Sequence, residues 1–324
     1  MTYKFDITAL GESLIDFVQA KQFEPEMQFI GNPGGAPANL LASASKFGMK
    51  CSFIGKVGND VFGSRIKKEY ISSNIDINSM IFSDTEHTTL TFVSLDESGD
   101  RNFFFYRDRT ADCSLTKDDI NIDTIRSSRI FHFGTLSMTA PCSREATLYA
   151  IKIAKENNVL VSFDPNYRAS LWNSIDDAKE AFACGSALAD IIKISDSELH
   201  LLSDLEDAEE AALDIIKRFG CKIVVVTMGR DGAICATSTG ITLRSAAYEV
   251  ETVDTTGAGD AFFGAFLSGI IRSGKTLDRL DAADLSAITG MASACGSLST
   301  TKYGAIPAMP SEEEVLALMQ RQKT

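Results

Sequence analysis

The chain has 324 residues, of which 44% are hydrophobic and 23% are charged, and its formal net charge is −13. This composition is that of an average globular protein and excludes an intrinsically disordered chain. The acidic balance, without any basic run, argues against a nucleic-acid partner, so an anionic ligand would have to be held by local features.

The cysteines and histidines of the sequence exclude further classes of protein. Seven cysteines are scattered between Cys51 and Cys295 without a CxxC pair, and only three histidines occur. We therefore expect neither a disulfide framework nor a histidine metal site. Lys4 and Asp6 stand where a secretory signal would be apolar. The longest apolar run, residues 261–271, is shorter than the ~20 residues of a membrane span, so we expect a cytoplasmic protein without a membrane partner.

Short apolar segments rich in β-branched and aromatic residues alternate with helical patterns along most of the chain. The expected strands are residues 5–10, 52–57, 130–133, 159–163, 191–194 and 223–227. The expected helices are residues 38–47 (ending at Gly48), 62–72, 144–157, 208–219, 260–272 and a last helix that opens with a capping box at 311–314. This alternation predicts βα units around a mostly parallel sheet.

Two segments break the alternation. Residues 13–30 and 88–108 have the pattern of strands without intervening helices, and the second contains a hairpin turn signal at 97–100. We expect a small β-sheet that projects from the α/β body and is built from these separated segments. The alternative is a pair of irregular surface loops. No repeat or linker is visible, which predicts one compact body.

The strongest chemical signal is the stretch from Asp254 to Asp260, which an apolar helix follows. Its residues Gly257, Ala258 and Gly259 are small, so backbone N–H groups can approach an anion closely. The N-terminus of a helix also leaves its first amides unpaired and carries a partial positive charge. Together these features predict a cradle for a phosphate group.

Asp260 directly follows this cradle, where a carboxylate would repel phosphate unless it served the nucleophile. As a general base it could accept the proton of a hydroxyl that attacks a γ-phosphate, while the cradle stabilises the transferring group. The local pattern leaves a second interpretation open, in which Asp260 only interacts with the helix N-terminus.

Two competing nucleotide motifs are weaker. Residues 269–276 fit GxxxxGK[ST], the P-loop formula, but that motif needs a preceding strand, and residues 261–272 have a helical pattern. We interpret Gly274 as the C-terminal glycine of this helix and Thr276 as the next N-cap. A dinucleotide-binding motif is not expected either, because Gly264 comes too late for GxGxxG.

The stretch ending at Asp260 resembles the second signature of the ribokinase-like (PfkB) sugar-kinase family. The first signature is present as Gly34-Gly35-Ala-Pro-Ala-Asn39, followed by a stretch rich in glycine at 53–63. The resemblance covers essentially the whole chain. It implies a ribokinase-like three-layer α/β sandwich with a mostly parallel central sheet, in one kinase domain of residues 1–324. The β-sheet lid would come from segments of about 13–35 and 87–110.

The resemblance also implies roles for residues of the reaction site. Asp260 would be the catalytic base, and Gly257, Ala258 and Gly259 would form the anion hole. The positions that would hold sugar hydroxyls are Asp16, Gly34, Gly35 and Asn39. Arg107 and Arg168 could bind the sugar or the transferring phosphate, or could form ordinary salt bridges.

Further positions would serve ATP and cations. The family's nucleotide loop matches Thr227, Gly229 and Gly232, and its Asn-x-x-Glu motif matches Ser195 to Glu198, preceded by Lys193. Glu198 would organise the water ligands of Mg²⁺. Ser195 and Ser293 stand where many relatives carry Asn. The positions that hold a monovalent cation in some members are Asp254, the carbonyl of Thr256 and Gly304, so K⁺ is a candidate.

The segments 105–107, 111–112 and 164–168 look most like those of fructokinases. This implies transfer of the ATP γ-phosphate to a primary hydroxyl of a small sugar, O6 in the case of fructose. A 2-keto-3-deoxygluconate kinase or another sugar or nucleoside kinase is the close alternative. A non-catalytic sugar- or nucleotide-binding regulator on the same fold is the distant one. An exposed apolar lid face could form a homodimer.

Overall fold

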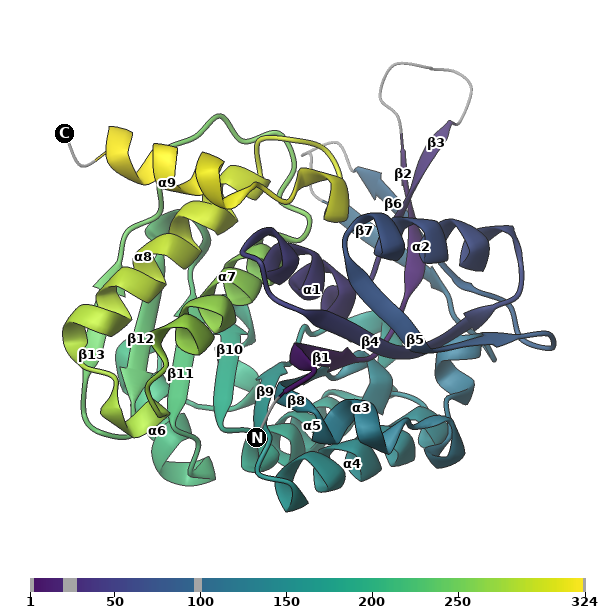
Figure 1. The fold of residues 1–324 in the computed structure, drawn as a ribbon, viewed down its shortest axis with the longest axis horizontal. Coiled ribbons are helices and arrows are strands. Elements are labelled where there is room, and N and C mark those ends of the chain that lie inside the picture. The colour runs from purple at the N-terminus through teal and green to yellow at the C-terminus, as the bar shows by residue number, and fades with distance from the viewer. Residues whose placement is uncertain (1–2, 20–27, 96–100, 323–324) are drawn as a thin grey trace.

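The chain forms two β-sheets of unequal size with helices on both faces of the larger one (Figure 1). The computed structural model describes residues 3–19, 28–95 and 101–322. The large sheet has nine strands in the order β13-β12-β11-β10-β9-β8-β1-β4-β5. In that order they are Thr242–Ser245, Ala233–Thr237, Ile223–Thr227, Ile191–Ser195, Leu160–Asp164, Ser128–Gly134, Phe5–Leu10, Cys51–Gly58 and Ile75–Ser83. The strands β12 and β13 are antiparallel at one edge, and the other strands pair in parallel.

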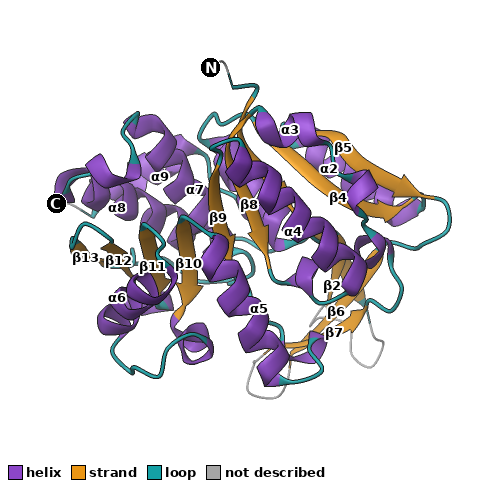
Figure 2. Cartoon of the chain, turned by 90° about the horizontal axis from the view of Figure 1, so that it is seen from below, coloured by secondary structure: helices purple, strands orange, loops and turns teal. Residues whose placement is uncertain are grey.

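Helices cover the large sheet in two layers. One layer contains α1 (Ala36–Lys46), α2 (Val61–Ser72), α7 (Ala258–Ser273) and α8 (Ala282–Ser299), with α9 (Glu312–Arg321) packed on α8. The opposite layer, in front of the sheet in Figure 2, contains α3 (Ile122–Arg126), α4 (Pro141–Glu156), α5 (Ile175–Leu188) and α6 (Ala208–Phe219). None of the helices within the described residues combines the length and the apolar character that crossing a membrane requires.

Alternation along each strand explains how one sheet supports both layers. Successive side chains of a strand point to opposite faces. In β11, Ile223 and Val225 belong to the core on the α7–α8 side, whereas Val224 and Val226 belong to the core on the α5–α6 side. These four side chains are fully buried. The predicted three-layer sandwich with a mostly parallel sheet is therefore confirmed.

The small sheet is the predicted lid. Its four strands are ordered β3-β2-β6-β7 and span Phe29–Gly34, Leu14–Gln19, Thr89–Leu95 and Arg101–Tyr106. The two chain segments meet where β2 and β6 pair in parallel. The interpretation as irregular loops is therefore wrong for the described residues. The turn signal at 97–100 lies outside the described residues.

Alternation also gives the lid two different faces. Asp16, Phe103 and Phe105 point toward the body, where they line a cavity. Phe17 and Phe92 stack on the opposite face, with their ring centroids 5.1 Å apart. The lid thus presents one carboxylate and aromatic rings to the cavity. On its opposite face Phe17 packs against Phe62 of α2, and Phe104 and Tyr106 are exposed.

The predicted helices and strands are present, with shifts at their ends. The helix expected over 38–47 is α1, and Gly48 follows it with φ +75°. The helix expected from Asp260 begins two residues earlier, so Asp260 is the third residue of α7. Gly274 ends α7 in the left-handed conformation, so the P-loop interpretation is excluded. Thr276 caps only a short 3₁₀ turn, and the capping box at Ser311 is confirmed.

A close crossing of α1 and α7 fixes the position of the helix that carries Asp260. A Cβ atom at Gly264 would lie 2.4 Å from the carbonyl oxygen of Leu40 and 2.7 Å from Ser43 Cβ. The Ser43 hydroxyl donates to the carbonyl of Ala261 across the same contact (2.8 Å). The lack of a side chain at Gly264 therefore sets the distance between the two helices.

We predict that Gly264→Ala lowers the free energy of unfolding by about 1–3 kcal/mol, because the added methyl group overpacks a backbone contact. Gly290→Ala in α8 is the matched control. Its Cβ would meet only Met319 Cε, at 4.0 Å. The control should be neutral or stabilising by up to about 1 kcal/mol, because alanine is the better helix former. Urea denaturation measures both, and equal stabilities of the two variants would contradict the role of the crossing.

Candidate functional site

The candidate site lies at the carboxyl ends of the central parallel strands, where polar residues follow each strand. There, β9, β10 and β11 end in Asp164, Ser195 and Thr227. Two cavities of about 680 Å³ and about 650 Å³ open at this edge. The first, the α8-side cavity, is lined by α7, α8 and the loops after β11 and β13. The second, the lid-side cavity, extends beneath the small sheet.

The two cavities meet at the N-terminus of α7. The residues that line both are Thr227, Gly229, Thr255, Ala258 and Gly259. Gly257, the N-cap, has φ +77°, a conformation that favours glycine. A molecule that occupies both cavities must therefore pass the first turn of α7.

The first turn of α7 offers unpaired amides at this junction. The Ala258 amide donates to the carbonyl of Thr255 (3.2 Å). The amides of Gly259 and Asp260 have no backbone acceptor among the described residues, as is usual for the first turn of a helix. The Gly257 amide has no backbone acceptor either, so among the described residues only Ala258 of the expected cradle has its N–H group engaged.

The Asp260 side chain faces the lid-side cavity and is held by α1. Asn39 Nδ2 donates to Asp260 Oδ2 over 2.8 Å. The Asn39 Oδ1 atom is buried and has no partner among the described residues, so it can accept a hydrogen bond from a ligand. Burial raises the pKa of Asp260, and the Lys193 charge and the Asn39 hydrogen bond oppose this rise. Asp260 is therefore a half-buried carboxylate with raised basicity.

Asp16 also points into the lid-side cavity, from the lid. Burial raises the pKa of Asp16 to about 7, which Arg168 opposes and Asp260 reinforces. A Cβ atom on Gly34 would lie 2.5 Å from Asp16 Oδ2. Gly35 has φ +116°, and its Cβ would lie 2.5 Å from the Glu12 carbonyl oxygen. Gly35 lines the cavity and Gly34 does not. The missing side chain of Gly34 therefore leaves space for the Asp16 carboxylate, and Gly34 does not form part of the cavity wall.

The two arginines named from the sequence have different surroundings. Arg107 is buried and donates to Asp112 (2.7 Å), to the Thr139 hydroxyl (2.5 Å) and to the Leu136 carbonyl (2.8 Å). It does not line the cavity, so its geometry is that of a structural ion pair. Arg168 does line the cavity, and its guanidinium lies 5.5 Å from the centre of the Phe103 ring.

A buried ionic group lies behind the cradle. Lys193 Nζ is 2.8 Å from Asp164 Oδ2, and Lys193 lines the lid-side cavity. Glu198 accepts hydrogen bonds from the Ser195 hydroxyl (2.6 Å), the Ser195 amide (2.9 Å) and the Tyr167 amide (2.5 Å). Although burial disfavours its charge, Lys193 and these bonds hold the pKa of Glu198 below its usual value. Ser195 therefore contacts Glu198 directly and anchors it.

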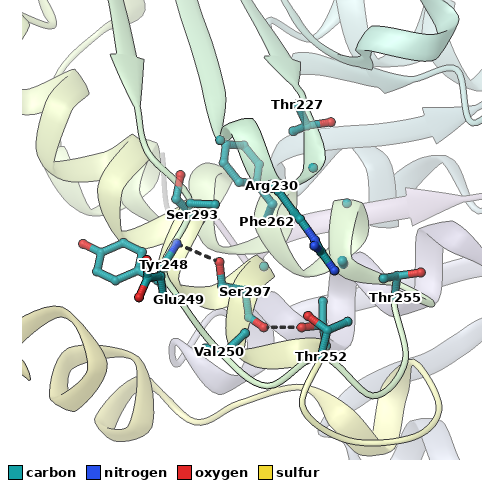
Figure 3. A pocket seen from close by; sticks show the side chains of 17 residues that line it. Thr227, Arg230, Tyr248, Glu249, Val250, Thr252, Thr255, Phe262, Ser293 and Ser297 are labelled. Atoms are coloured by element: carbon teal, nitrogen blue, oxygen red, sulfur yellow. Dashed lines mark hydrogen bonds between the residues drawn. The ribbon is translucent and has the colours of Figure 1, made fainter. Parts of the chain in front are cut away.

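The α8-side cavity collects the other nucleotide-loop residues, and Figure 3 shows it from close by. Thr227, Gly229 and Gly232 come from the loop after β11, and Ser293 comes from α8. The Ser293 hydroxyl donates to that of Ser245 (3.1 Å). Sequence reasoning did not name Arg230 or Tyr248, which also line this cavity.

The three positions expected for a monovalent cation lie together behind the first turn of α7. Asp254 is 2% exposed and accepts hydrogen bonds from the amides of Thr256 (2.7 Å) and Gly304 (3.0 Å). Gly304 has φ +85°, which glycine adopts without strain. The carboxylate thus joins the loop before α7 to the loop after α8.

Glu12 is a functional candidate to which the sequence assigned no role. It is 2% exposed, lines the lid-side cavity and accepts a hydrogen bond from the Ala36 amide at the start of α1 (2.9 Å). Burial raises the pKa of Glu12 from 4.5 to about 7, against the hydrogen bonds and the Arg107 charge. The glycine-rich motif around it was visible in the sequence, but its burial was not.

We predict that Glu12→Gln weakens the pH dependence of stability. The folded state binds the Glu12 proton more tightly than the unfolded chain does, so its contribution is complete below pH 4.5 and is lost as the pH rises through about 7. The loss is at most about 3 kcal/mol. Urea denaturation at about pH 5 and about pH 8 should show a smaller fall for the variant than for the wild type. The exposed Glu251→Gln is the control, and an unchanged fall in the Glu12 variant would contradict the assignment.

Known proteins with similar sequences are carbohydrate kinases. Residues 4–312 match the model of the pfkB family carbohydrate kinases. Probable fructokinase-3 of Arabidopsis thaliana is 38% identical over 321 residues, which are 98% of this chain and 92% of the relative. Fructokinase-1 of Zea mays is 37% identical over 319 residues, 97% of this chain and 98% of the relative.

Solved structures show the same fold. Fructokinase with bound ATP from Xylella fastidiosa superposes with a TM-score of 0.90 at 30% identity, covering 98% of this chain and 99% of that one. A fructokinase double mutant from Vibrio cholerae O395, in a form with bound fructose, ADP and potassium ion, gives 0.87 at 30% identity, covering 98% and 100%. The ribokinase-like fold is therefore confirmed, and the chain belongs to the pfkB family of carbohydrate kinases.

Proposed function

We propose that this protein is an ATP-dependent fructokinase that transfers the γ-phosphate of ATP to the O6 hydroxyl of D-fructose. The observation that carries the proposal is the position of Asp260. Its carboxylate lines the lid-side cavity, directly after Gly259, which lines both cavities. It lies next to helix N-terminal amides that have no backbone acceptor among the described residues, and Asn39 Nδ2 is 2.8 Å from its Oδ2. The similarity to fructokinases over nearly the full chain supports the choice of sugar.

Each cavity would take one substrate. ATP would occupy the α8-side cavity, with its phosphates reaching toward the lid-side cavity through the glycine-rich loop at Gly229 and Gly232. The sugar would lie beneath the lid, where Asp16 and the free Oδ1 of Asn39 can bind hydroxyl groups. A hydroxyl beside Asp260 then faces the γ-phosphate in line.

Asp260 would accept the proton of the attacking hydroxyl, and the amides of Gly259 and Asp260 would bind the oxygens of the transferring group. The oxygen–phosphorus bond to the sugar forms while the bond to the leaving ADP breaks. The lid would exclude water, which competes as a phosphate acceptor. The whole chain, residues 1–324, would act as one kinase domain in which segments 13–35 and 87–110 close over the sugar.

Cations would assist at two places. Mg²⁺ would accompany the nucleotide phosphates, with Glu198 holding its water ligands. K⁺ would bind near Asp254, the Thr256 carbonyl and Gly304, where it would strengthen the positive end of α7. The potassium ion bound to the fructokinase double mutant from Vibrio cholerae O395 supports K⁺ as the cation.

The assembly and the location are part of the same proposal. The outer lid face exposes Phe104 and Tyr106 by 57% and 66%, and we propose that two copies meet there. Exposed aromatic residues grouped on one face are typical of interaction surfaces. The protein would act in the cytoplasm, where ATP and free sugar occur together.

A panel of sugars separates fructose from its alternatives. Coupled detection of ADP should show the highest kcat/KM with fructose, ahead of 2-keto-3-deoxygluconate and nucleosides. A sugar acid would need a cationic partner for its carboxylate, and of the two arginines named from the sequence only Arg168 lines the cavity. Binding of ATP without ADP release on any sugar would instead support a non-catalytic regulator.

We predict that Asp260→Ala lowers kcat by about 10²–10⁴-fold, because the attacking hydroxyl loses its base. ATP should still bind, since the α8-side cavity is not lined by Asp260. Steady-state kinetics with fructose and calorimetric titration with ATP measure the two effects. The exposed Asp204→Ala, which lines neither cavity, is the control. Near-normal turnover of the Asp260 variant would exclude Asp260 as the base.

We predict that turnover is several-fold higher in potassium salts than in tetramethylammonium salts of equal ionic strength. In Asp254→Ala this difference should disappear, because the carboxylate that organises the cation loops is lost. Initial rates at saturating ATP and fructose test the prediction. A potassium effect of undiminished size in the variant would place the cation elsewhere.

A further inference from the structure

Lys193 is a buried lysine with unused hydrogen-bond donors. It lies on β10, its exposed fraction is 6%, and its side chain lines the lid-side cavity. An ammonium group has three donors. Asp164 accepts one of them at 2.8 Å, and no other described residue accepts a hydrogen bond from it. A buried ammonium normally satisfies its remaining donors, so this geometry is incomplete without a further acceptor.

The unused donors lie beside the first turn of α7. A Cβ atom on Gly259 would be 2.8 Å from Lys193 Nζ and 3.3 Å from its Cε. The ammonium therefore occupies the space that any side chain at position 259 would fill. It stands next to the amides of Gly259 and Asp260, which lack backbone acceptors among the described residues.

This placement brings two sources of positive charge to one point. The N-terminus of a helix carries a partial positive charge, which disfavours a cation nearby. Here an ammonium and the amides of α7 converge from two elements on one point. Within the described part of the chain Asp164 is the one carboxylate at ion-pair distance from the ammonium, and Glu198 and Asp260 favour its charge from further away. An anion at that point would bind both positive groups.

We infer that Lys193 is a catalytic residue that donates hydrogen bonds to the transferring phosphoryl group, and that Asp164 is the positioning residue that holds its ammonium. This inference rests on the proposed kinase function. In the reaction the sugar hydroxyl gives its proton to Asp260, the new oxygen–phosphorus bond forms and the bond to ADP breaks. Lys193 keeps its own proton throughout and neutralises charge on the equatorial oxygens.

Asp164 is suited to hold Lys193 because its backbone is fixed, although its Oδ1 atom has no hydrogen-bond partner among the described residues. It is 2% exposed and ends β9, whose neighbour β8 pairs with it at Gly134. The carbonyl of the next residue, Pro165, accepts hydrogen bonds from the amide (3.2 Å) and the hydroxyl (2.5 Å) of Thr135. The ammonium is thus tied to the central sheet rather than to a surface loop.

The Lys193 charge acts on the base as well. Burial raises the pKa of Asp260, and Lys193 is the largest of the influences that oppose the rise. The other charged groups near Asp260 are Arg168, which also lowers its pKa, Glu198, which raises it, and the carboxyl groups of Asp16 and Asp164, whose own pKa values Asp260 raises. Removal of the Lys193 charge should therefore leave a base that ionises only at higher pH.

The test compares Lys193→Met, which keeps the length of the side chain and removes its charge, with the wild type. We expect kcat to fall about 10²–10³-fold, as for the loss of one donor to a developing charge. The dissociation constant of ATP from calorimetry and the KM for fructose should change less than about threefold, since the contact forms fully only in the transition state. The acid limb of the kcat–pH profile should move to higher pH.

Two further variants guard against misfolding. Lys193→Met/Asp164→Asn removes both charges of the pair, so no buried charge is left alone. Because the two residues act as one unit, the kcat of this double variant should be as low as that of Lys193→Met. Asp164→Asn alone should lower kcat less, because Lys193 is still present to contact the phosphoryl group. The exposed Lys222→Met is the matched control and should keep the wild-type kcat and pH profile.

The possible failures are distinct. A wild type that phosphorylates no sugar overturns the proposed kinase function. An active wild type with Lys193 variants of near-normal kcat and an unmoved acid limb overturns the inference about Lys193. A large rise in the ATP dissociation constant with unchanged kcat also overturns it, because Lys193 would then only bind the ground state.

Discussion

The hydrogen bond from Asn39 to Asp260 joins residues that are 221 positions apart in the chain. Asn39 lies in the first turns of α1 and Asp260 in the first turn of α7, so this bond aligns the amino ends of two helices over one point. The close crossing of the same helices at Gly264 makes the alignment possible. Without this crossing, the carboxylate that the lid-side cavity requires would have neither its partner nor its position.

Several carboxyl groups that are wholly or partly buried lie in the region of this bond. Glu12, Asp16, Asp164 and Asp260 are all carboxyl groups whose pKa is raised by burial. Such a cluster lowers the stability of the empty protein at neutral pH, because like charges are held together away from water. Groups of this kind gather at functional sites, where they serve substrates rather than stability.

Much of the fold could be predicted from the sequence, for physical reasons. Strands such as β11 show a continuous apolar run because both faces of a central parallel sheet are buried. The helix α8 escaped prediction because it is packed between α7 and α9, so apolar and small residues occur all around it. The strand β5 escaped because it is an edge strand that contains Asp76, Asn78 and Ser79 instead of an apolar run.

The site was predictable only in part. The family resemblance assigned Asp260, Asn39 and Lys193 to the reaction site, and the structure brings them together. It could not show that the Arg107 guanidinium is occupied by Asp112, because a pairing of side chains depends on packing. The same limit applies to Glu12 and Asp164, whose importance comes from burial and from a partner elsewhere in the chain.

The connection between lid and body has a mechanical consequence. β3 ends at Gly34 and α1 begins at Ala36, so a single residue, Gly35, separates a strand of the small sheet from the helix that carries Asn39. Glu12 clamps the first amide of that helix from the body side. A change in the tilt of the lid at Gly35 would therefore be passed on to Asn39, which lies about one helical turn further along the chain. If the lid closes over the sugar as proposed, capture of the substrate and alignment of the base would be one movement.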